Sequence, residues 1–600
     1  MQGRLVLVGL SAAIALGAAP LSAGAGTSAS PAGFPGDSSF AKSVQVAKVA
    51  NVLATTQQTS CYTPEVPYGL QQTAEGYSGE EDCAGRSTTG EALGPYPTQA
   101  GSASGYPASM PMLVKGHSES NLVVDPKDPN HLIGSSKWFV SPEGYNHVLG
   151  FYESTDGGKT WPSQGHIPGF EGWTDNTDPV GAFDGYGNFY EFVLGYQFYY
   201  DPNGGHDFNI GNHAVNPTVP QEVVAVAVRP KGSSGAGGWK TTVNGRPDYV
   251  ATYAPIGNEP DKQWITIDSN PASPHFNTIY AMWVVFNAIG SKPYVSTAQA
   301  LPDGTHTPWT APQRLPTVNG TAGDTYLLPH VDGFGTVWTP VSNFPAMQGF
   351  STYNLSLDYS TDGGRTFQGP VPVPGAQNVI QPPYCCYQNT NTRSGITDTF
   401  AVGRRLVNGR YPLYVAWEDY STGFANLFLS ASYDGGGTWT PSKKINDNAN
   451  PQVDEFQPNL ATSTNGTVSI AFYDRRLACP AFGTAEAAAA GLALDTNNPH
   501  YPNLPPYGAP NYCVNGAVQF YDAHLNAKDG NLRLSQHSFD PELNAPLYAL
   551  GTDITRGFLG DYFGHDDSPT QSFSSFVSTY DDGTNREHRQ QQLVATVAIP

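Results

Sequence analysis

The stretch from Ser154 to Trp161, "STDGGKTW", occurs three times in this 600-residue chain with small changes. The second copy is "STDGGRTF" at 360–367, and the third is "SYDGGGTW" at 432–439. The aspartate of each copy can accept hydrogen bonds from backbone N–H groups across a tight turn, and the paired glycines permit positive φ. The aromatic residue can then pack beneath the turn. We therefore predict that this cassette is the turn of a β-hairpin and that it does no chemistry.

Degenerate copies of the cassette place it in a repeat. "GAGGWKT" begins at Gly235 and "DGTHTPWT" begins at Asp303. With positions 156, 237, 303, 362 and 434 as markers, the spacings are 81, 66, 59 and 72 residues. A loose period of about 70 residues is typical of a β-propeller built from four-stranded blades.

A second pattern lies between the cassettes and counts the blades. It consists of an apolar strand, a turn with Asp, Asn or Gly, and another apolar strand. Clear copies begin at positions 120, 178, 262, 400 and 457, and weaker copies begin near 330 and 561. Seven hairpins of this kind predict a seven-bladed propeller, with six blades as the alternative. Few residues remain for the seventh blade, so segments before His117 are expected to complete it.

The composition agrees with an all-β chain and suggests three regions. Gly (66 residues) and Pro (51 residues) are abundant, and 12% of the residues are aromatic, which suits short strands joined by tight turns. Residues 1–25 resemble a signal peptide, with Arg4, an apolar run and a cleavage site at 23–25. We expect an N-terminal extension, partly flexible, over 26–110. The propeller is expected over 111–600, interrupted by an insertion at 480–512.

Six cysteines suit an oxidising, extracellular location. Cys479 and Cys513 flank the insertion, and we predict a disulfide between them. The other four leave their state open: Cys61 and Cys83 could pair, and the adjacent Cys385 and Cys386 could form a vicinal disulfide or stay as free thiols.

The charge of the chain limits its partners. The net charge is −22, which makes nucleic acid a poor partner, and no segment after the signal is long and apolar enough to span a membrane. We expect a secreted monomer that binds an extracellular glycan or polysaccharide. No cofactor is predicted with certainty, although Asp- and Asn-rich loops are compatible with Ca²⁺.

The cassette S-x-D-G-G-x-T-W is similar to the Asp-box, also called the BNR repeat, so the chain resembles the sialidase-like β-propellers over about 115–600. The segments "DEFQPNLATSTNGTVSIAFYDRR" and "FLGDYFG" look like those of secreted bacterial proteins labelled exo-sialidases. This resemblance implies a glycoside hydrolase that releases terminal acidic sugars. Sialidases carry an early Arg-Ile-Pro motif, and none precedes the first cassette here. A histidine-dependent polysaccharide lyase similar to the rhamnose–glucuronate lyases, or a non-catalytic glycan- or protein-binding propeller, are the alternatives.

Candidate catalytic residues follow from the topology of a propeller. Ligands usually bind at the end of the channel where the chain enters each inner strand, and the cassettes belong to the opposite end. Polar residues occur at this point in every inner hairpin: His117, Glu119, Asp175, Asp178, Asp261, Lys262, His330, Arg393, Asp398, Glu455, Gln457 and Asp561. An imidazole can move a proton near pH 7, and paired carboxyl groups can act as acid and base. We predict His117, His330, Asp261, Glu119 and Asp561 as catalytic residues.

Candidate substrate-binding residues lie at the same end. Arginine and lysine can hold the carboxylate of an acidic sugar, and aromatic faces can stack on sugar rings. On these grounds we predict Arg393, Arg475, Arg476, Lys262, Trp417 and Tyr473 as substrate-binding residues. No zinc-type spacing of cysteines or histidines occurs, so no metal ligand is assigned.

Overall fold

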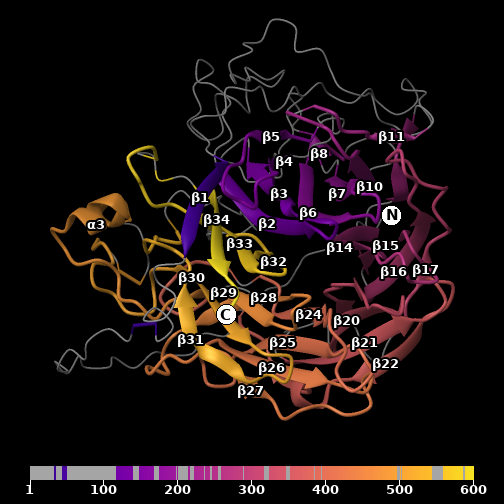
Figure 1. Cartoon of the computed structure of the whole chain (residues 1–600). Helices are drawn as coiled ribbons and strands as arrows, with labels where there is room; N and C mark the ends of the chain where they lie inside the picture. Colours follow the sequence, from indigo (N-terminus) through magenta and orange to yellow (C-terminus); the bar gives the residue numbers. More distant parts are fainter. Residues whose placement is uncertain are drawn as a thin grey trace, which may run out of the picture.

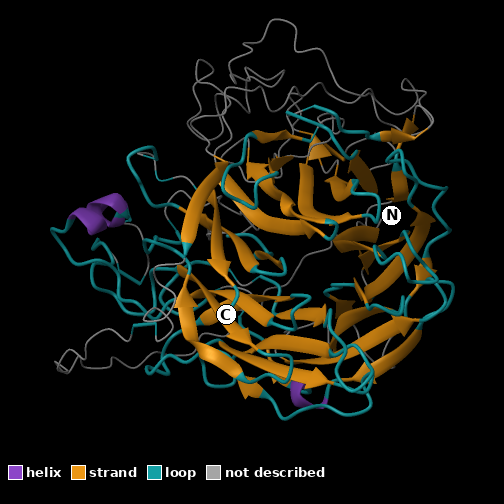
Figure 2. Ribbon diagram, in the orientation of Figure 1, coloured by secondary structure: helices purple, strands orange, loops and turns teal. Residues whose placement is uncertain are grey.

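The structure is a computed structural model. It describes residues 33–34, 44–50, 116–139, 147–167, 175–196, 199–200, 214–215, 222–235, 237–243, 246–253, 258–287, 289–316, 323–345, 352–383, 386–393, 395–495, 500–501, 503–542, 559–585, 588 and 590–600. Strands dominate these residues (Figure 2), which confirms the all-β class. The predicted signal peptide, Cys61 and Cys83 lie outside the described residues.

Most strands form antiparallel groups of four, which we call units one to seven in chain order. Unit one contains β2 (Gly116–Asp125), β3 (Asp128–Phe139), β4 (His147–Ser154) and β5 (Ser163–His166). Unit two contains β6 (Asp175–Phe183), β7 (Phe189–Tyr196), β10 (Glu222–Arg229) and β13 (Tyr249–Tyr253). Unit three contains β14 (Asn258–Ile267), β15 (Thr278–Asn287), β16 (Gly290–Gln299) and β17 (Gln313–Arg314).

Unit four has a first strand in two pieces. It contains β18 (Gly323–Thr325), β19 (His330–Val331), β20 (Val337–Phe344), β21 (Thr352–Ser360), β22 (Gln368–Pro372) and β23 (Val379–Ile380). One parallel pair, Ser291 with Gly323, joins units three and four into a ten-stranded sheet.

The remaining units return to the antiparallel group of four. Unit five contains β24 (Asp398–Val402), β25 (Leu413–Asp419), β26 (Asn426–Ser432) and β27 (Lys443–Lys444). Unit six contains β28 (Glu455–Thr462), β29 (Val468–Asp474), β30 (Asn515–Tyr521) and β31 (Ala527–Arg533). Unit seven contains β32 (Gly564–Asp567), β33 (Gln571–Ser578), β34 (Gln591–Ala598) and β1 (Gln45–Ala50).

Short elements lie outside the units. They are β8 (Tyr199–Tyr200), β9 (Ala214–Val215), β11 (Thr242–Val243), β12 (Arg246–Pro247), the 3₁₀ turns η2 (Pro374–Ala376) and η3 (Leu492–Leu494), and the helix α3 (Ala485–Ala489). Among the residues that the structure describes, no helix is long and apolar enough to cross a membrane.

The first strands of the units face one another around a common centre (Figure 1). β2 contacts β6, β6 contacts β14, β14 contacts β19, and the series continues through β24 and β28 to β32, which contacts β2 again. Buried apolar side chains fill the space between each pair of consecutive units. This packing stabilises the molecule through its unit interfaces, and it leaves the ends of the first strands to carry polar groups.

The last unit joins the two ends of the chain. β1 pairs with β34 in antiparallel register, from Gln45 opposite Thr596 to Ala50 opposite Gln592. The expectation that a segment before His117 completes this unit is therefore confirmed. Phe34 is also buried, against the core shared by units five and six, so part of the predicted N-terminal extension belongs to the folded body.

The three cassettes form turns between the third and fourth strands of units one, four and five. In the first, Asp156 accepts hydrogen bonds from the backbone N–H of Thr160 (2.9 Å) and from its hydroxyl (2.6 Å). Asp362 and Asp434 repeat both contacts. The predicted turn geometry is confirmed, and each aspartate is fully used by its own turn.

The insertion lies between β29 and β30, and Cys479 and Cys513 form the predicted disulfide at its base. Helix α3 is tied back to the body, because Glu486 accepts hydrogen bonds from Tyr580 (2.8 Å) and bonds to His537 (2.9 Å). Cys386 is disulfide-bonded, which excludes the alternative in which Cys385 and Cys386 are both free thiols.

Candidate functional site

The first strands of units one, two, three and six share a bulge near the point where each begins. The pairing register shifts between residues 118 and 121, 177 and 180, 261 and 264, and 456 and 459. In each gap one non-glycine residue adopts positive φ, and these residues are Glu119 (52°), Asp178 (55°), Lys262 (53°) and Gln457 (55°). A bulge redirects its side chain, and backbone held in sparsely populated regions clusters at functional sites. Tyr326, with φ of 59°, follows the first piece of the split strand in unit four.

Three of these residues belong to a group of charged and phenolic side chains that we call the central cluster. Its members come from units one, two and three and from the segments before units five and seven. The members are Glu119, Lys137, Asp178, Asp261, Lys262, Arg393, Asp561 and Tyr562. The bulges therefore gather residues that are far apart in the sequence.

Asp561 binds two cations at once. Its Oδ2 lies 2.7 Å from Lys262 Nζ, and its Oδ1 lies 2.7 Å from Arg393 Nη2. The segment around Asp561 fits tightly against β2, because Gly560 has φ of 104° and an added Cβ would collide with the backbone of Glu119. Lys262 and Arg393, two of the four cations that were predicted to hold an acidic sugar, are thus engaged by a carboxylate of the protein itself.

Asp178 and Glu119 form the second half of the cluster. Tyr562 donates a 2.8 Å hydrogen bond to Asp178 Oδ2, and Lys262 Nζ lies 3.5 Å from the same oxygen. Glu119 Oε2 lies 3.1 Å from Lys137 Nζ and accepts a 3.3 Å bond from the backbone N–H of Asp178. All five of these side chains are held by contacts within the protein.

The two carboxyl groups have opposite pKa shifts. Burial, reinforced by the charge of Asp178, raises the pKa of Glu119 from 4.5 to about 8. Burial also acts on Asp178, but Lys262 and Lys137 outweigh it and lower the pKa of Asp178 below its usual range. Separated pKa values in neighbouring carboxyl groups are the usual basis of acid and base roles.

Asp261 is the most accessible carboxyl group of the cluster. Its side chain is 31% exposed, compared with 1% for Glu119 and 7% for Asp561. Burial raises the pKa of Asp261 to about 6, although Lys262 at 3.3 Å acts in the opposite direction. A carboxyl group with this pKa can donate a proton at mildly acidic pH and accept it back.

An aromatic wall accompanies these charges. Trp264 lies two residues after Lys262, is partly exposed, and packs edge-on against the Tyr562 ring at 5.4 Å between ring centroids. Sequence reasoning missed Trp264, Tyr562 and Lys137. The bulge between Asp261 and Trp264 breaks the alternation of faces along the strand, so spacing alone does not place Trp264.

Other predicted residues do not join the cluster. His330 packs its half-buried ring against Phe400 at 5.8 Å between ring centroids, and burial, with the charge of Arg404, lowers its pKa to about 4. The positive-φ residue of its unit is Tyr326, four residues earlier, because the first strand of unit four is split. His117 lies in β2 opposite Trp138, but its side chain is outside the described residues.

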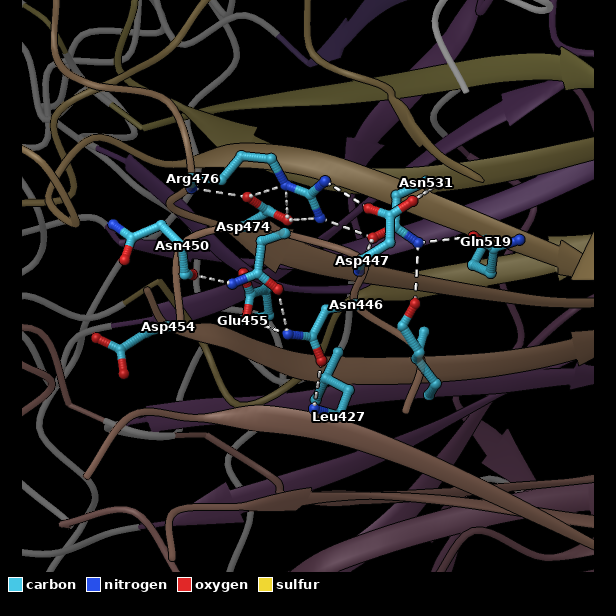
Figure 3. A network of polar contacts seen from close by, with 12 residues as sticks. Leu427, Asn446, Asp447, Asn450, Asp454, Glu455, Asp474, Arg476, Gln519 and Asn531 are labelled. Atoms are coloured by element: carbon cyan, nitrogen blue, oxygen red, sulfur yellow. Dashed lines mark hydrogen bonds and ion pairs between the residues drawn. The ribbon is translucent and has the colours of Figure 1, made fainter. Parts of the chain in front are cut away.

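Arg475 and Arg476 are buried inside units five and six, which corrects their predicted role. Arg475 is 0% exposed, donates a 3.0 Å hydrogen bond to Thr390, and lies over the Phe456 ring. Arg476 binds Asp474, Asp447 and Asn531 at 2.6 to 3.1 Å (Figure 3). Neither guanidinium is available to a sugar carboxylate.

Trp417 and Tyr473 are also core residues. Trp417 is 1% exposed and stacks on Phe428, and Tyr473 is 0% exposed between Phe456 and Phe563. The prediction that they form an exposed aromatic rim is wrong, because alternate residues at the ends of these strands face the unit interfaces. Among the described residues, no group of three His, Cys, Asp or Glu side chains could hold a metal ion.

Comparisons with known proteins give no family assignment. No family model and no curated protein matches the chain. Solved structures that resemble it include a protein of unknown function from Dyadobacter fermentans, at 13% identity over 81% of this chain and 96% of that chain, with a TM-score of 0.39. Others are the polysaccharide lyase Uly1, at 10% identity over 84% and 95% with a TM-score of 0.42, and Trypanosoma rangeli sialidase, at 10% over 61% and 54% with a TM-score of 0.35. Similarities this low assign no function.

Proposed function

We propose that this protein is a secreted, seven-bladed β-propeller with a glycoside hydrolase site in the central cluster. Support for the propeller comes from seven antiparallel units whose first strands contact one another in a continuous series. The disulfide at Cys479 and Cys513 is compatible with an extracellular location. Such propellers bind ligands where loops meet at one end of the central channel.

The hydrolase proposal rests on the difference in exposure and protonation between Asp261 and Asp178, together with the contact of Tyr562 to Asp178. Asp261 is accessible and has a pKa of about 6, whereas Asp178 is buried, ionised and hydrogen-bonded to Tyr562. Glycoside hydrolysis needs one carboxyl group that gives a proton and another that stays negative beside the sugar.

Asp261 acts first as the acid and then as the base. Asp261 protonates the glycosidic oxygen, and the bond from that oxygen to the anomeric carbon breaks with its electron pair staying on the leaving group. Asp178 stabilises the positive charge on the sugar, and Tyr562 holds Asp178 in place. Water next adds to the anomeric carbon and gives a proton to Asp261, which restores the starting state. Trp264 offers the sugar an apolar face.

The pairing of the cations favours a neutral sugar over the terminal acidic sugar that the sequence suggested. Asp561 already binds both Lys262 and Arg393, each at 2.7 Å. Lys137 is 7% exposed and lies 3.1 Å from Glu119. A substrate carboxylate would therefore have to compete with carboxyl groups of the protein for each of these cations. A histidine-dependent lyase is less well supported, because His330 packs on Phe400 outside the cluster.

A panel of 4-methylumbelliferyl glycosides tests the proposal. The panel contains neutral hexosides, a uronide and the sialoside, and release of the fluorescent phenol is measured for the wild type and for Asp178→Asn. We expect turnover of a neutral glycoside and a loss of about 10²-fold or more in Asp178→Asn. Turnover of the sialoside alone would reinstate the acidic sugar. A binding-only propeller would be indicated by no turnover of any glycoside.

A further inference from the structure

A pocket of about 440 Å³ lies between units two and three, away from the central cluster. This volume is within the range of about 300–1,000 Å³ that is usual for small-molecule sites. The pocket is lined by the edge strand of unit two and by three strands of unit three, and its lining residues are Val250, Ala251, Thr252, Tyr253, Asn258, Val285, Asn287, Lys292, Tyr294 and Pro312.

Two tyrosines of the pocket are held in place by one buried tryptophan. Trp283 is 0% exposed, and its indole N–H donates a 2.6 Å hydrogen bond to the Tyr253 hydroxyl. The Trp283 ring also stacks on Tyr294, with 6.2 Å between centroids and 20° between planes. Both tyrosines are only partly buried, so each presents a fixed aromatic surface to the pocket.

Two amides lie side by side in the same lining. Asn258 and Asn287 are direct partners in the pairing of β14 with β15, and opposite residues have Cβ atoms about 5 Å apart. Asn287 Oδ1 accepts a hydrogen bond from the backbone N–H of Ile289 (3.0 Å), which orients its amide. Paired amides supply both donors and acceptors, as the hydroxyl groups of a sugar require.

The surroundings of the pocket disfavour an anionic ligand. Among the described residues of the lining, Lys292 is the one lysine, and it is neutralised by Asp324 at 2.6 Å. Glu222 is the strand partner of Tyr253, is 8% exposed, and its Oε2 has no hydrogen-bond partner among the described residues. Burial, with Glu259 and Asp261 nearby, raises the pKa of Glu222 to about 9. The local charge is therefore neutral to negative.

We propose that this pocket binds a neutral sugar ring, with Tyr253 and Tyr294 on its apolar faces and Asn258 and Asn287 on its hydroxyl groups. Asn258 precedes Asp261 by three residues in β14, which corresponds to about 10 Å along a strand. The pocket can therefore hold an outer ring of the same oligosaccharide whose glycosidic bond lies at the central cluster. Binding by the pocket goes beyond the proposed hydrolysis and does not depend on it.

The stacked pair alone does not make a site, because it recurs elsewhere. Trp338 stacks on Tyr359 in unit four at 4.5 Å and 26°. Tyr359 is partly buried like Tyr294, but it is not part of the pocket lining. What distinguishes unit three is the combination of the stack with a cavity and two paired amides. Tyr359→Ala is accordingly a matched control for Tyr294→Ala.

The test is calorimetric titration of the full-length protein with cellohexaose, mannohexaose and xylohexaose as neutral probes and with hexagalacturonate as an acidic probe. The titrations are made in an Asp261→Asn background to prevent turnover. We expect at least one neutral probe to bind, and Tyr294→Ala and Asn258→Ala each to weaken it by about tenfold, as for a central contact residue. Tyr359→Ala should leave the affinity unchanged.

Three results would overturn the proposal: no binding of any neutral probe, binding that survives both pocket variants, or preferential binding of hexagalacturonate. If Tyr294→Ala does not fold, Asn258→Ala alone decides. Failure of the hydrolase proposal is recognised separately, because it shows as no turnover of any methylumbelliferyl glycoside by the wild type. Turnover of such monosaccharide substrates should not change in the control variant Tyr359→Ala, whichever way the binding result falls.

Discussion

Two buried charge networks in this molecule use the same residue types for different purposes. The central cluster joins residues of three units and two preceding segments, and its cations reach solvent, with 15% exposure for Lys262 and 10% for Arg393. In the Arg476 network, formed by Asp447, Asp474, Arg476 and Asn531, the side chains of Arg476 and Asp474 are 0% exposed, whereas Asp447 is 29% exposed (Figure 3). The exposure of the cations and the number of segments that contribute, more than residue type, separate a place for chemistry from a packing device.

The local geometry explains why the two networks differ. Arg476 lies two residues after Asp474, at the end of β29, and both of its other partners approach from units five and six. Each nitrogen of the Arg476 guanidinium therefore has an acceptor within the interface of units five and six. The central cluster instead forms where bulges turn side chains of several first strands toward one another, and such a meeting point cannot be covered by any single unit.

The largest effect is expected from removing Arg476. Arg476→Ala leaves Asp474 and Asp447 without their cation, and breaking a buried pair costs about 3–5 kcal/mol. Denaturant unfolding should show this loss, while kcat of the folded fraction stays within twofold of the wild type. The exposed pair of Arg404 with Asp566, where the arginine is 40% exposed, is the control, since Arg404→Ala should cost less than about 1 kcal/mol. Equal losses in both variants would contradict a special structural role for the buried Arg476 network.

Asp261→Asn should have the opposite effect, with a large loss of activity and little loss of stability. The amide cannot donate a proton to the leaving group, so kcat on an alkyl glycoside should fall by about 10²–10⁴-fold, with little change in unfolding free energy. An aryl leaving group needs less protonation, and its turnover should fall less. Because the pKa of Asp261 is about 6, wild-type activity should decline as the pH rises through that value. Loss of the same magnitude on both substrates would argue against an acid role.

The proton on Glu119 gives a smaller effect with a definite sign. The pKa of Glu119 rises from 4.5 to about 8 on folding, so the folded protein keeps a proton that the unfolded chain releases. This contribution to stability is complete below pH 4.5 and is lost as the pH rises to about 8, with a slope of at most about 1.4 kcal/mol per pH unit. From pH 5 to pH 8 the unfolding free energy of the wild type should fall relative to that of Glu119→Gln, by at most this slope. Parallel curves would contradict the shift.

Much of the architecture could be predicted because it depends on local rules. The cassette at 154–161 needs its aspartate and glycines to close one turn, and the Cys479–Cys513 pair closes an insertion that breaks a regular repeat. The polar residues near the starts of the first strands could also be predicted. Glu119, Asp178, Lys262 and Asp561 are expected at one end of the molecule, and they do lie together. Periodicity alone carried these predictions.

The site predictions that failed depended on which way each side chain points. His330 was assigned by counting from a strand that is split in the structure, so Tyr326 holds its expected position. Arg475 and Arg476 follow an apolar strand, as an exposed pair would, but their partners Thr390 and Asn531 come from distant segments. No spacing in the sequence reports such partners, and a bulge changes the facing of every residue after it.

The smallest effect should come from the cassettes, which lie between the third and fourth strands and contribute no residue to either network. Asp362 accepts hydrogen bonds from the backbone N–H of Thr366 (3.0 Å) and from its hydroxyl (2.7 Å), and Thr366 and Asp362 are both accessible to water. Asp362→Ala therefore loses hydrogen bonds that water can partly replace, and we expect about 1 kcal/mol of destabilisation. Its kcat and KM should equal those of the wild type, because no side chain of the central cluster touches this turn. A clear loss of turnover at unchanged stability would show that the cassettes take part in the chemistry, and the comparison between the two networks would then have to include a third region.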